Sequence, residues 1–175
     1  MPTPTDVLRE EHRVILRTLG VLEAAAVRLA GGRPLPEGWW PEIIAWLRGV
    51  ADKNHHAKEE TFLFPAMVKA GVPLVGGPIG VMLEEHERGR ALIRAMEAGE
   101  PAARAAKARE YVTLLREHIE KENGVLFPLA DAVLDEAAQR ALQRDFDAVA
   151  TEQGRDASIP HAEAAVERLT AALAA

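Results

Sequence analysis

Apolar residues recur at steps of three and four along most of the chain. Near the N-terminus, Leu8, Ile15 and Leu19 share this spacing with His12. A period close to 3.6 residues is typical of an α-helix that buries one face. The spacing predicts a first helix over residues 6–30, which a segment rich in glycine and proline then ends.

The same periodicity predicts three further long helices. The second can begin at Pro41, because proline is favoured in the first helical turn. After a loop at 71–78, a third helix extends from Ile79 to about Gly99, and a fourth begins at Pro101. Short connections between four such helices favour an antiparallel up-down four-helix bundle.

Two weaker amphipathic stretches follow, at 135–152 and 159–174, with a break at Gly154. Neither stretch belongs to a repeat, so we expect them to pack outside the bundle or to extend an interface. His161 lies in the second stretch and has no counterpart elsewhere in the chain, so it is interpreted as a surface or interface histidine.

The composition agrees with an all-α fold. Hydrophobic residues make up 48% of the chain but aromatic residues only 5%, so alanine and aliphatic side chains must fill the core. This balance favours closely packed helices over a β-sandwich. A length of 175 residues suits one domain. We expect a single domain over 1–175, with the bundle core at about 6–132 and a C-terminal helical extension at about 133–175.

Charge and targeting signals narrow the function classes. The formal net charge of −6 argues against binding to nucleic acid or to an anionic membrane. The N-terminal residues lack the apolar core of a secretory signal. The longest uncharged run, 71–83, is too short to span a bilayer and contains prolines and glycines. We therefore expect a cytoplasmic protein without a membrane anchor.

The chain contains no cysteine. Disulfides, thiolate metal sites and cysteine-ligated iron–sulfur clusters are excluded for this chain. Any metal ion must therefore be held by nitrogen and oxygen atoms.

The most informative feature is a segment that occurs twice. Residues 55–65 and 118–128 align without a gap, and each copy carries His and Glu four positions apart and ends in Leu-Phe-Pro. The tripeptide Glu-Glu-His precedes each copy, at 10–12 and 84–86.

This spacing predicts a metal site inside the bundle. Positions i and i+4 lie on the same face of a helix, and here they fall on the apolar stripe. Carboxylates facing a core are costly unless they are paired or bound to metal. Four imidazoles and two carboxylates form a ligand set for two metal ions. The predicted ligands are His12, His55, Glu59, His86, His118 and Glu122.

The first copy allows two registers, because His55 with Glu59 and His56 with Glu60 have the same spacing. Counting back from each Leu-Phe-Pro aligns His55 with His118 and Glu59 with Glu122, which favours the first register. His56 is then expected to support the ligands or to be partly exposed, and Glu60 is a further candidate for that supporting role.

Two other features stay open at this point. Tyr111 lies seven residues before His118 on the same face, so it either supports a ligand or is a core tyrosine. The prolines at 65 and 128 either end their helices or kink them at the ligand end.

Nitrogen and oxygen ligands without thiolate suit iron or manganese best, with zinc as a further candidate. Two carboxylates could bridge two ions that each hold two imidazoles. With one bridging oxygen from solvent, each ion keeps an open position for a small molecule. A single zinc ion would leave several of these groups unused.

At these residues the sequence resembles the hemerythrin-like (HHE cation-binding) family, from His12 to Pro128. The resemblance implies an antiparallel four-helix bundle around a non-haem, oxo- or hydroxo-bridged pair of iron ions that binds oxygen, nitric oxide or peroxide. It further implies that the four histidines are terminal ligands and that Glu59 and Glu122 are bridges.

The match departs from the oxygen-carrying hemerythrins, which use five histidines, one Glu and one Asp. Four histidines and two glutamates are closer to the branch linked to iron-centre repair and to iron or redox sensing. The repair-type relatives commonly carry an additional cysteine-containing N-terminal segment, and no such segment is present here.

Three functions follow as expectations. The first is a di-iron protein that binds or senses O2, NO or peroxide, with peroxide decomposition as an added activity under oxidative stress. The second is an iron-handling protein for iron-centre repair. The third is a structural bundle that zinc staples. No catalytic acid–base residue is predicted, the partner is a small molecule, and a homodimer is compatible with this interpretation.

Overall fold

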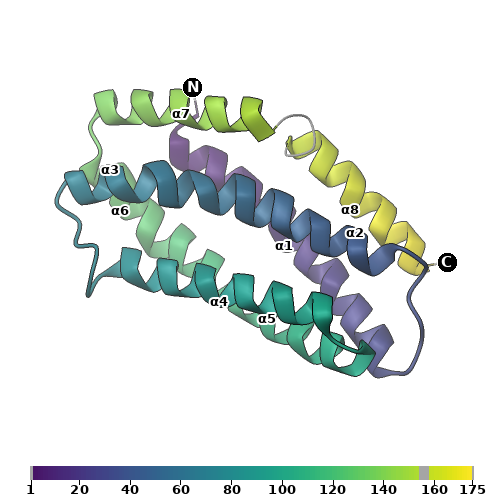
Figure 1. The fold of residues 1–175 in the computed structure, drawn as a ribbon. Helices are drawn as coiled ribbons and strands as arrows, with labels where there is room; N and C mark the ends of the chain where they lie inside the picture. The colour runs from purple at the N-terminus through teal and green to yellow at the C-terminus, as the bar shows by residue number, and fades with distance from the viewer. Residues whose placement is uncertain (1, 154–157, 175) are drawn as a thin grey trace.

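The computed structural model describes residues 2–153 and 158–174, and the regular elements in these ranges are all helical. Four long helical segments form an antiparallel bundle, and two further helices lie along one side of it (Figure 1). The predicted fold class, an all-α four-helix bundle with additional C-terminal helices, is confirmed.

Helix α1 spans Pro4–Ala30 and is the first helix of the bundle. Thr3 begins it with a capping box, in which its hydroxyl accepts from the backbone N–H of Asp6 at 3.2 Å and its own N–H donates to the Asp6 carboxylate at 2.9 Å. The buried face carries His12 among leucines and alanines, so the amphipathic pattern of this segment places a histidine inside the bundle.

The second long helix is continuous but changes its winding. It comprises α2 (Trp39–Trp46), the π-helical η1 (Leu47–His56) and η2 (Glu59–Leu63), and α3 (Phe64–Lys69). It begins two residues before the expected Pro41, because Gly38 adopts a left-handed conformation with φ of 75° and turns the chain into the helix.

The third and fourth helices follow the predicted bounds closely. Helix α4 spans Pro78–Ala98. Helix α5 (Pro101–Lys121) then continues through the π-helical η3 (Glu122–Leu126) into α6 (Phe127–Val133).

Pro65 and Pro128 do not end their helices. Of the two interpretations that the sequence left open, helix termination is therefore wrong. Each lies in the first turn of the helix that follows a π-helical turn. The amide of Phe64 bonds back to the carbonyl of Glu59, and the amide of Phe127 bonds back to that of Glu122. In a π-helical turn the backbone hydrogen bonds join residues five apart, which widens the turn. The wider turn accommodates a proline, which has no N–H to donate, so the helix can continue past it.

Two hydrophobic clusters lie on either side of a polar layer. The larger cluster contains residues of α1, α2, α4, α5 and α8, with Leu19, Trp40 and Met96 among its fully or nearly buried members. The smaller cluster contains Leu8 and Phe127 and is covered in part by α7. His12 falls between Leu8 of the smaller cluster and Val14 of the larger one, so the polar layer separates the two.

The C-terminal helices α7 (Glu136–Gln153) and α8 (Ile159–Ala174) match the two predicted stretches. The predicted break at Gly154 lies outside the described residues. Indole N–H groups anchor α8, since Trp39 donates to the carbonyl of Leu169 at 2.9 Å and Trp46 donates to that of Ala162 at 3.1 Å.

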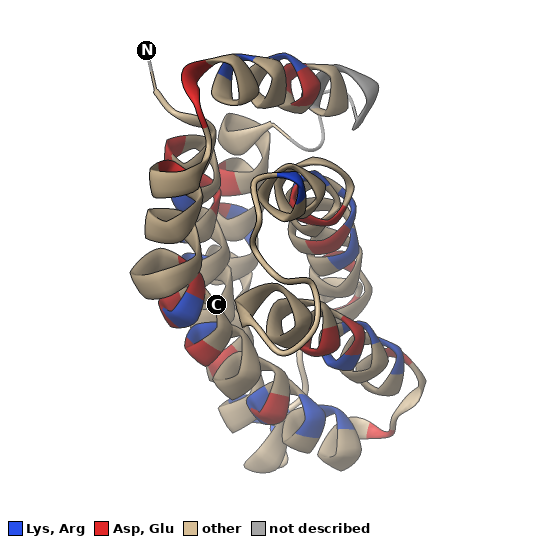
Figure 2. Ribbon diagram, turned by 90° about the vertical axis from the view of Figure 1, so that its left-hand side faces the viewer, with Lys and Arg blue, Asp and Glu red and all other residues tan. Residues whose placement is uncertain are grey.

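Charged residues of both signs are interspersed along the helices (Figure 2). Among the residues that the structure describes, no helix combines the length and the apolar character needed to cross a membrane.

Candidate metal centre

Seven ligand-type side chains meet in the middle of the bundle, and all are buried to at most 4% exposure. All four long helices contribute. The seven are His12 of α1, His55 and His56 of η1, Glu59 of η2, His86 of α4, His118 of α5 and Glu122 of η3.

These side chains form two groups that share Glu59. In each group the ligand atoms all lie within 4.8 Å of one another. The first group is His12, His55, Glu59 and Glu122, and the second is His56, Glu59, His86 and His118.

Both carboxylates reach across the two groups. Glu122 places Oε2 at 3.1 Å from Nε2 of His12 and Oε1 at 3.2 Å from Nε2 of His118. Glu59 places Oε1 at 3.6 Å from Nε2 of His55 and Oε2 at 3.4 Å from Nε2 of His86. Each carboxylate therefore offers one oxygen to each group, as a bridge between two ions requires.

The inward atoms of this layer lack hydrogen-bond partners within the described chain. They include Nε2 of His12 and His55, both ring nitrogens of His56, and all four carboxylate oxygens. Leaving so many polar atoms buried and unpaired is costly. Nε2 of His86 also faces Nε2 of His118 at 3.1 Å. Cations between these atoms would satisfy them together, so the donor set fits a pair of metal ions.

A second layer of polar groups orients the imidazoles. Four rings turn Nδ1 outward to an oxygen atom at hydrogen-bond distance and Nε2 inward to the site. A proton on Nδ1 leaves the Nε2 lone pair free for a metal ion, so this layer selects the tautomer that can ligate. The pairs are His12 with Asn123 at 3.0 Å, His55 with Glu11 at 2.9 Å, His86 with Glu60 at 2.7 Å and His118 with Glu85 at 2.9 Å. For His56, Asp52 lies 3.7 Å from Nδ1, beyond hydrogen-bond distance.

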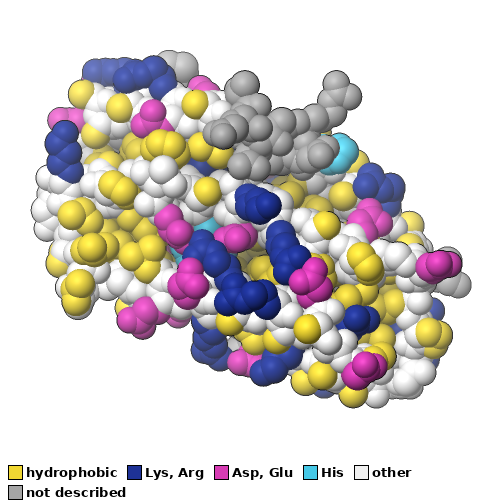
Figure 3. Space-filling model, in the orientation of Figure 1, with side chains coloured by type: hydrophobic (Ala, Val, Ile, Leu, Met, Phe, Trp, Pro, Cys, Tyr) yellow, Lys and Arg dark blue, Asp and Glu magenta, His cyan; other side chains and the backbone are white. Residues whose placement is uncertain are grey.

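Cations outside this layer hold its carboxylates. Lys58 donates to Glu11, and Lys121 donates to Glu85. Arg90 alone holds the two other carboxylates of the layer, those of Glu60 at 2.5 Å and Asp52 at 2.8 Å. On the face shown in Figure 3, charged side chains of both signs gather over the middle of the bundle.

The doubled segment encodes much of this second layer. Glu11 and Glu85 each precede a ligand histidine, and Lys58 and Lys121 each lie three residues after one. Glu60 and Asn123 also correspond, since each follows a predicted bridging glutamate. Our interpretation of the sequence named only Glu60 among these supporting residues, although the repeat marks the others too.

The phenylalanines of the Leu-Phe-Pro motif close the site at one end. Phe127 stacks on His12 with ring centroids 5.3 Å apart, and Phe64 stacks on His86 with centroids 6.0 Å apart. Each repeat therefore contributes an aromatic lid to a histidine of a different helix.

Without cations the two bridging carboxylates titrate unequally. Burial raises the pKa of Glu59 well above its ordinary value, and the charge of Glu122 raises it further. Burial also opposes ionisation of Glu122, but electrostatic attraction from His118 and then from His12 outweighs it and lowers the pKa of Glu122. Without cations, Glu59 is thus harder to ionise than Glu122.

The histidines differ in the same way. Burial lowers the pKa of His55 to about 4 and that of His56 to about 3, with neighbouring imidazoles adding to the effect. Burial acts in this direction on His118 too, but the charges of Glu122 and Glu85 outweigh it and raise the pKa of His118 to about 9.

His56 is buried, so the expectation that it could be partly exposed is wrong. It is 4% exposed, and its ring lies 3.9 Å from that of His86 in a stacked arrangement. The sequence treated His55 and His56 as alternatives because each has a Glu four residues later. The π-helical winding of η1 turns both toward the site, so the layer holds five histidines.

The other supporting candidates differ from each other. Glu60 lies beside His86. Tyr111 instead lies in the larger hydrophobic cluster against Gly89, where a Cβ on the glycine would be 3.6 Å from the tyrosine ring. Burial, and then the charge of Asp52, raise the pKa of Tyr111. Within the described part of the chain no hydrogen bond joins Tyr111 to the cluster, so its surroundings are those of a core tyrosine, one of the two alternatives that the sequence left open.

Comparison with curated proteins finds iron-sulfur cluster repair proteins among the relatives of this chain. The chain is 31% identical over 134 residues to the iron-sulfur cluster repair protein YtfE of Yersinia pseudotuberculosis serotype O:1b, an alignment that covers 69% of this chain and 60% of that protein. The protein of this name from Yersinia pestis (strain Pestoides F) is 31% identical with equal coverage, and that of Yersinia pseudotuberculosis serotype IB is 32% identical. The chain thus spans less than two thirds of the length of these relatives.

No solved structure matches this chain. The family model of the hemerythrin HHE cation binding domain matches residues 3–130, which include the helices that carry all seven clustered side chains. On the length of that match, this chain belongs to the hemerythrin HHE cation binding domain family.

Proposed function

We propose that this protein holds two iron ions in its polar layer and binds or senses O2, NO or peroxide there. The observation that carries the proposal is the pair of carboxylates that each offer one oxygen to each group of histidines. Helical bundles with inward-facing glutamates and histidines are a common setting for di-iron and di-manganese centres. A mixed imidazole and carboxylate set suits iron better than a structural zinc ion, which four ligands would satisfy.

The two proposed positions are unequal. One would receive imidazoles from His56, His86 and His118, and the other only from His12 and His55. Since both would share the two carboxylates, the second position has one protein ligand fewer. We propose that the small molecule binds at this second position. When the iron pair is bound, it would supply electrons to such a small molecule.

The chain's own residues would prepare this position rather than carry out chemistry. Phe127 stacks on His12 and keeps bulk water from that side of the site. Glu11 fixes the ring of His55. Other than the ligands and their hydrogen-bond partners, no acid–base pair faces the site within the described residues, which favours binding or sensing over turnover.

The count of five clustered histidines changes one argument. The four histidine ligands predicted from the sequence differ in number from the five of the oxygen-carrying hemerythrins. The five clustered histidines remove this difference in number, although both carboxylates here are glutamates. Oxygen binding therefore stays within the proposal beside NO and peroxide.

Iron handling for iron-centre repair is the second candidate. It is supported by the printed function of the relatives, which are iron-sulfur cluster repair proteins. This chain has no cysteine, so any transfer of iron from it must use imidazole and carboxylate ligands.

Metal analysis of protein purified without oxygen tests the proposal. We expect two irons per chain, and a near-ultraviolet and visible charge-transfer spectrum that changes on exposure to O2, NO or hydrogen peroxide in turn. One zinc per chain with no visible absorption would overturn both iron functions. Loss of iron to an apo-cluster acceptor, without a spectral response to any of the three molecules, would favour repair.

A further inference from the structure

The two copies of the doubled segment, with the Glu-Glu-His that precedes each copy, supply two matching glutamate–lysine pairs. The surroundings of the two pairs differ. The side chains of Glu11 and Lys58 are 5% and 4% exposed, whereas those of Glu85 and Lys121 are 18% and 41% exposed. The four residues occupy corresponding positions in the repeats, so the bundle alone does not account for the difference.

Helix α7 accounts for it. This helix begins at Glu136, beyond the residues 3–130 that the family model matches, and packs on α1, η1 and η2. Its Phe146 is 1% exposed and places its ring over Lys58, with the ring centroid 5.9 Å from Nζ. In the described part of the chain no corresponding ring covers Lys121.

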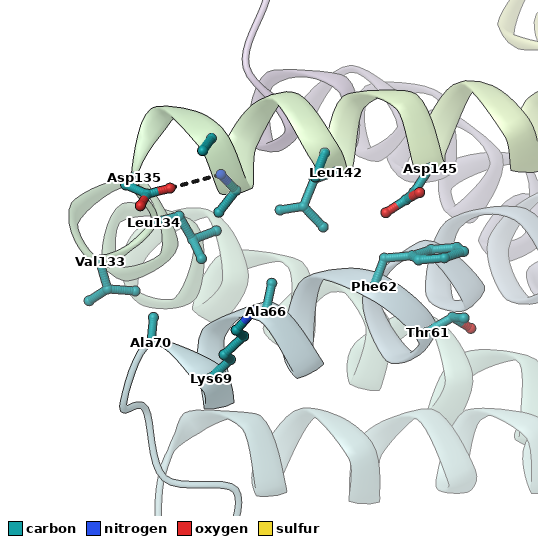
Figure 4. Close-up of a pocket in the computed structure, with 13 residues that line it drawn as sticks. Thr61, Phe62, Ala66, Lys69, Ala70, Val133, Leu134, Asp135, Leu142 and Asp145 are labelled. Carbon is teal, nitrogen blue, oxygen red and sulfur yellow. Dashed lines mark hydrogen bonds between the residues drawn. The ribbon is translucent and has the colours of Figure 1, made fainter.

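Beside this contact, α7 leaves a cavity of about 660 Å³ against η2 and α3 (Figure 4). Leu142 and Asp145 of α7 point into it, and Phe62 faces them from η2. On α7 the lining ends at Asp145, the residue before Phe146. Truncating Phe146 should therefore let water from the cavity reach the ammonium group of Lys58.

The buried pair controls one imidazole. Lys58 and Asn54 both donate to Oε1 of Glu11, which leaves Oε2 for Nδ1 of His55. A carboxylate held at both oxygens cannot rotate, and it fixes the plane of the His55 ring and the place of Nε2.

We propose that α7 is a positioning element for the metal position of His12 and His55, acting through Phe146 and the Glu11–Lys58 pair. This inference rests on the proposed two-ion site. Removing one partner of a buried ion pair is costly because the other charge stays buried without compensation. At the exposed Lys121, water can take the place of the ammonium group, and such pairs contribute little. The family bundle would thus bind two ions, and α7 would make one of the two positions dependent on a helix that the family model does not include.

Release of iron to a chelator tests this. Wild-type protein loaded with Fe(II) without oxygen is mixed with excess ferrozine, and the absorbance of the complex gives the number of ions and the rate of each release phase. Lys58→Met and Phe146→Ala should speed the release of one iron by about 10- to 100-fold, the range for loss of a group that supports a ligand. The other iron should keep its rate to within about two-fold.

Two control variants match these. Lys121→Met removes the corresponding lysine of the other repeat and should change either rate by less than about five-fold, as for an exposed ion pair. Phe146→Leu keeps an apolar cover over Lys58 and should restore slow release. If Phe146→Ala disrupts α7, which circular dichroism would reveal, Lys58→Met decides the result because it leaves Phe146 in place.

The outcomes separate the inference from the proposed function. Wild-type protein that holds fewer than two irons would overturn both. Two irons in the wild type, with Lys58→Met slowing release, speeding both phases alike or acting no more strongly than Lys121→Met, would overturn the role of α7 alone.

Discussion

The two hydrophobic clusters of the bundle differ in whether the buried polar atoms beside them have hydrogen-bond partners. In the larger one, polar atoms that reach the interior find partners, as when Trp40 donates its indole N–H to the carbonyl of Met96 at 3.1 Å. The smaller one contains Leu63 and Leu126, the last residues of the π-helical turns that begin at Glu59 and Glu122. The carboxylate oxygens of these two glutamates have no hydrogen-bond partner in the described chain. Burial of apolar surface alone can stabilise the end of the bundle that holds the larger cluster. The end that holds the smaller cluster requires cations for its full stability.

The backbone winding changes at the polar layer between the clusters. The turns at Glu59 and Glu122 are π-helical, and η1 is π-helical up to His56. Single π turns are often found at functional sites, where they turn a side chain to a direction that a regular helix does not allow. The winding that serves the metal layer is thus a departure from the regular bundle, and ligand binding must offset its cost.

The largest expected effect is on the layer between the clusters. Glu59→Ala removes a carboxylate that reaches both groups of histidines, so iron content should fall from two per chain to one or none. Glu60→Ala is the matched control, because it removes a hydrogen-bond partner of His86 and Arg90 but no proposed ligand, and it should weaken binding by about 10- to 100-fold while two ions still bind at saturation. Metal analysis after gel filtration distinguishes them. Full loading of Glu59→Ala would mean that Glu60 is the ligand.

Removal of the metal should then reduce hydrogen-exchange protection more in the smaller cluster than in the larger one. At free iron about 1,000-fold above its dissociation constant, bound metal stabilises the folded state by about 4 kcal/mol. Hydrogen exchange of the chelated protein should show lost protection at Leu63–Met67 and Leu126–Ala130, next to the unpaired carboxylates. Protection at Leu19–Leu22, inside the larger cluster, should change little. Equal loss at both ends would show that the bundle unfolds as one unit and would remove the comparison.

His56→Ile is expected to change stability and binding in opposite directions. The second repeat already carries Ile119 at the corresponding position. Replacing a buried imidazole whose two nitrogens lack partners by an apolar side chain should stabilise the metal-free protein by about 1–3 kcal/mol. One of the two ions should bind at least about 10-fold more weakly, since it loses a ligand. Urea denaturation without metal and an iron titration check the two signs. A destabilised metal-free protein with unchanged iron affinity would assign His56 a packing role.

Much of this architecture follows from sequence pattern. Long runs with a period near 3.6 residues give the four bundle helices and both C-terminal ones, since apolar stripes are the strongest local signal of helix. The doubled segment also aligned Glu59 rather than Glu60 with Glu122, and in the structure Glu59 faces inward while Glu60 lies beside Arg90.

The inward turn of His56 could not be predicted in this way. His55 and His56 each have a Glu four residues later, so the sequence treated them as alternatives. Whether a helix widens to π winding depends on tertiary contacts, which local propensity does not report. The sequence also left open whether Tyr111 supports a ligand or lies in the core. Seven residues bring it to the same face as His118 but two turns away, in the larger cluster.

The smallest expected effect lies farthest from the metal layer. Trp39→Phe removes the indole N–H that donates to the Leu169 carbonyl of α8 and should cost about 1 kcal/mol, the usual contribution of one such hydrogen bond. Trp40→Phe is the matched control within the bundle, because it removes the bond to Met96 and leaves α8 in place. Thermal denaturation should show similar losses for both, and iron content should stay at the wild-type value. A fall in iron content for Trp39→Phe would contradict the division argued above, because it would mean that α8 and the larger cluster also hold the metal layer in place.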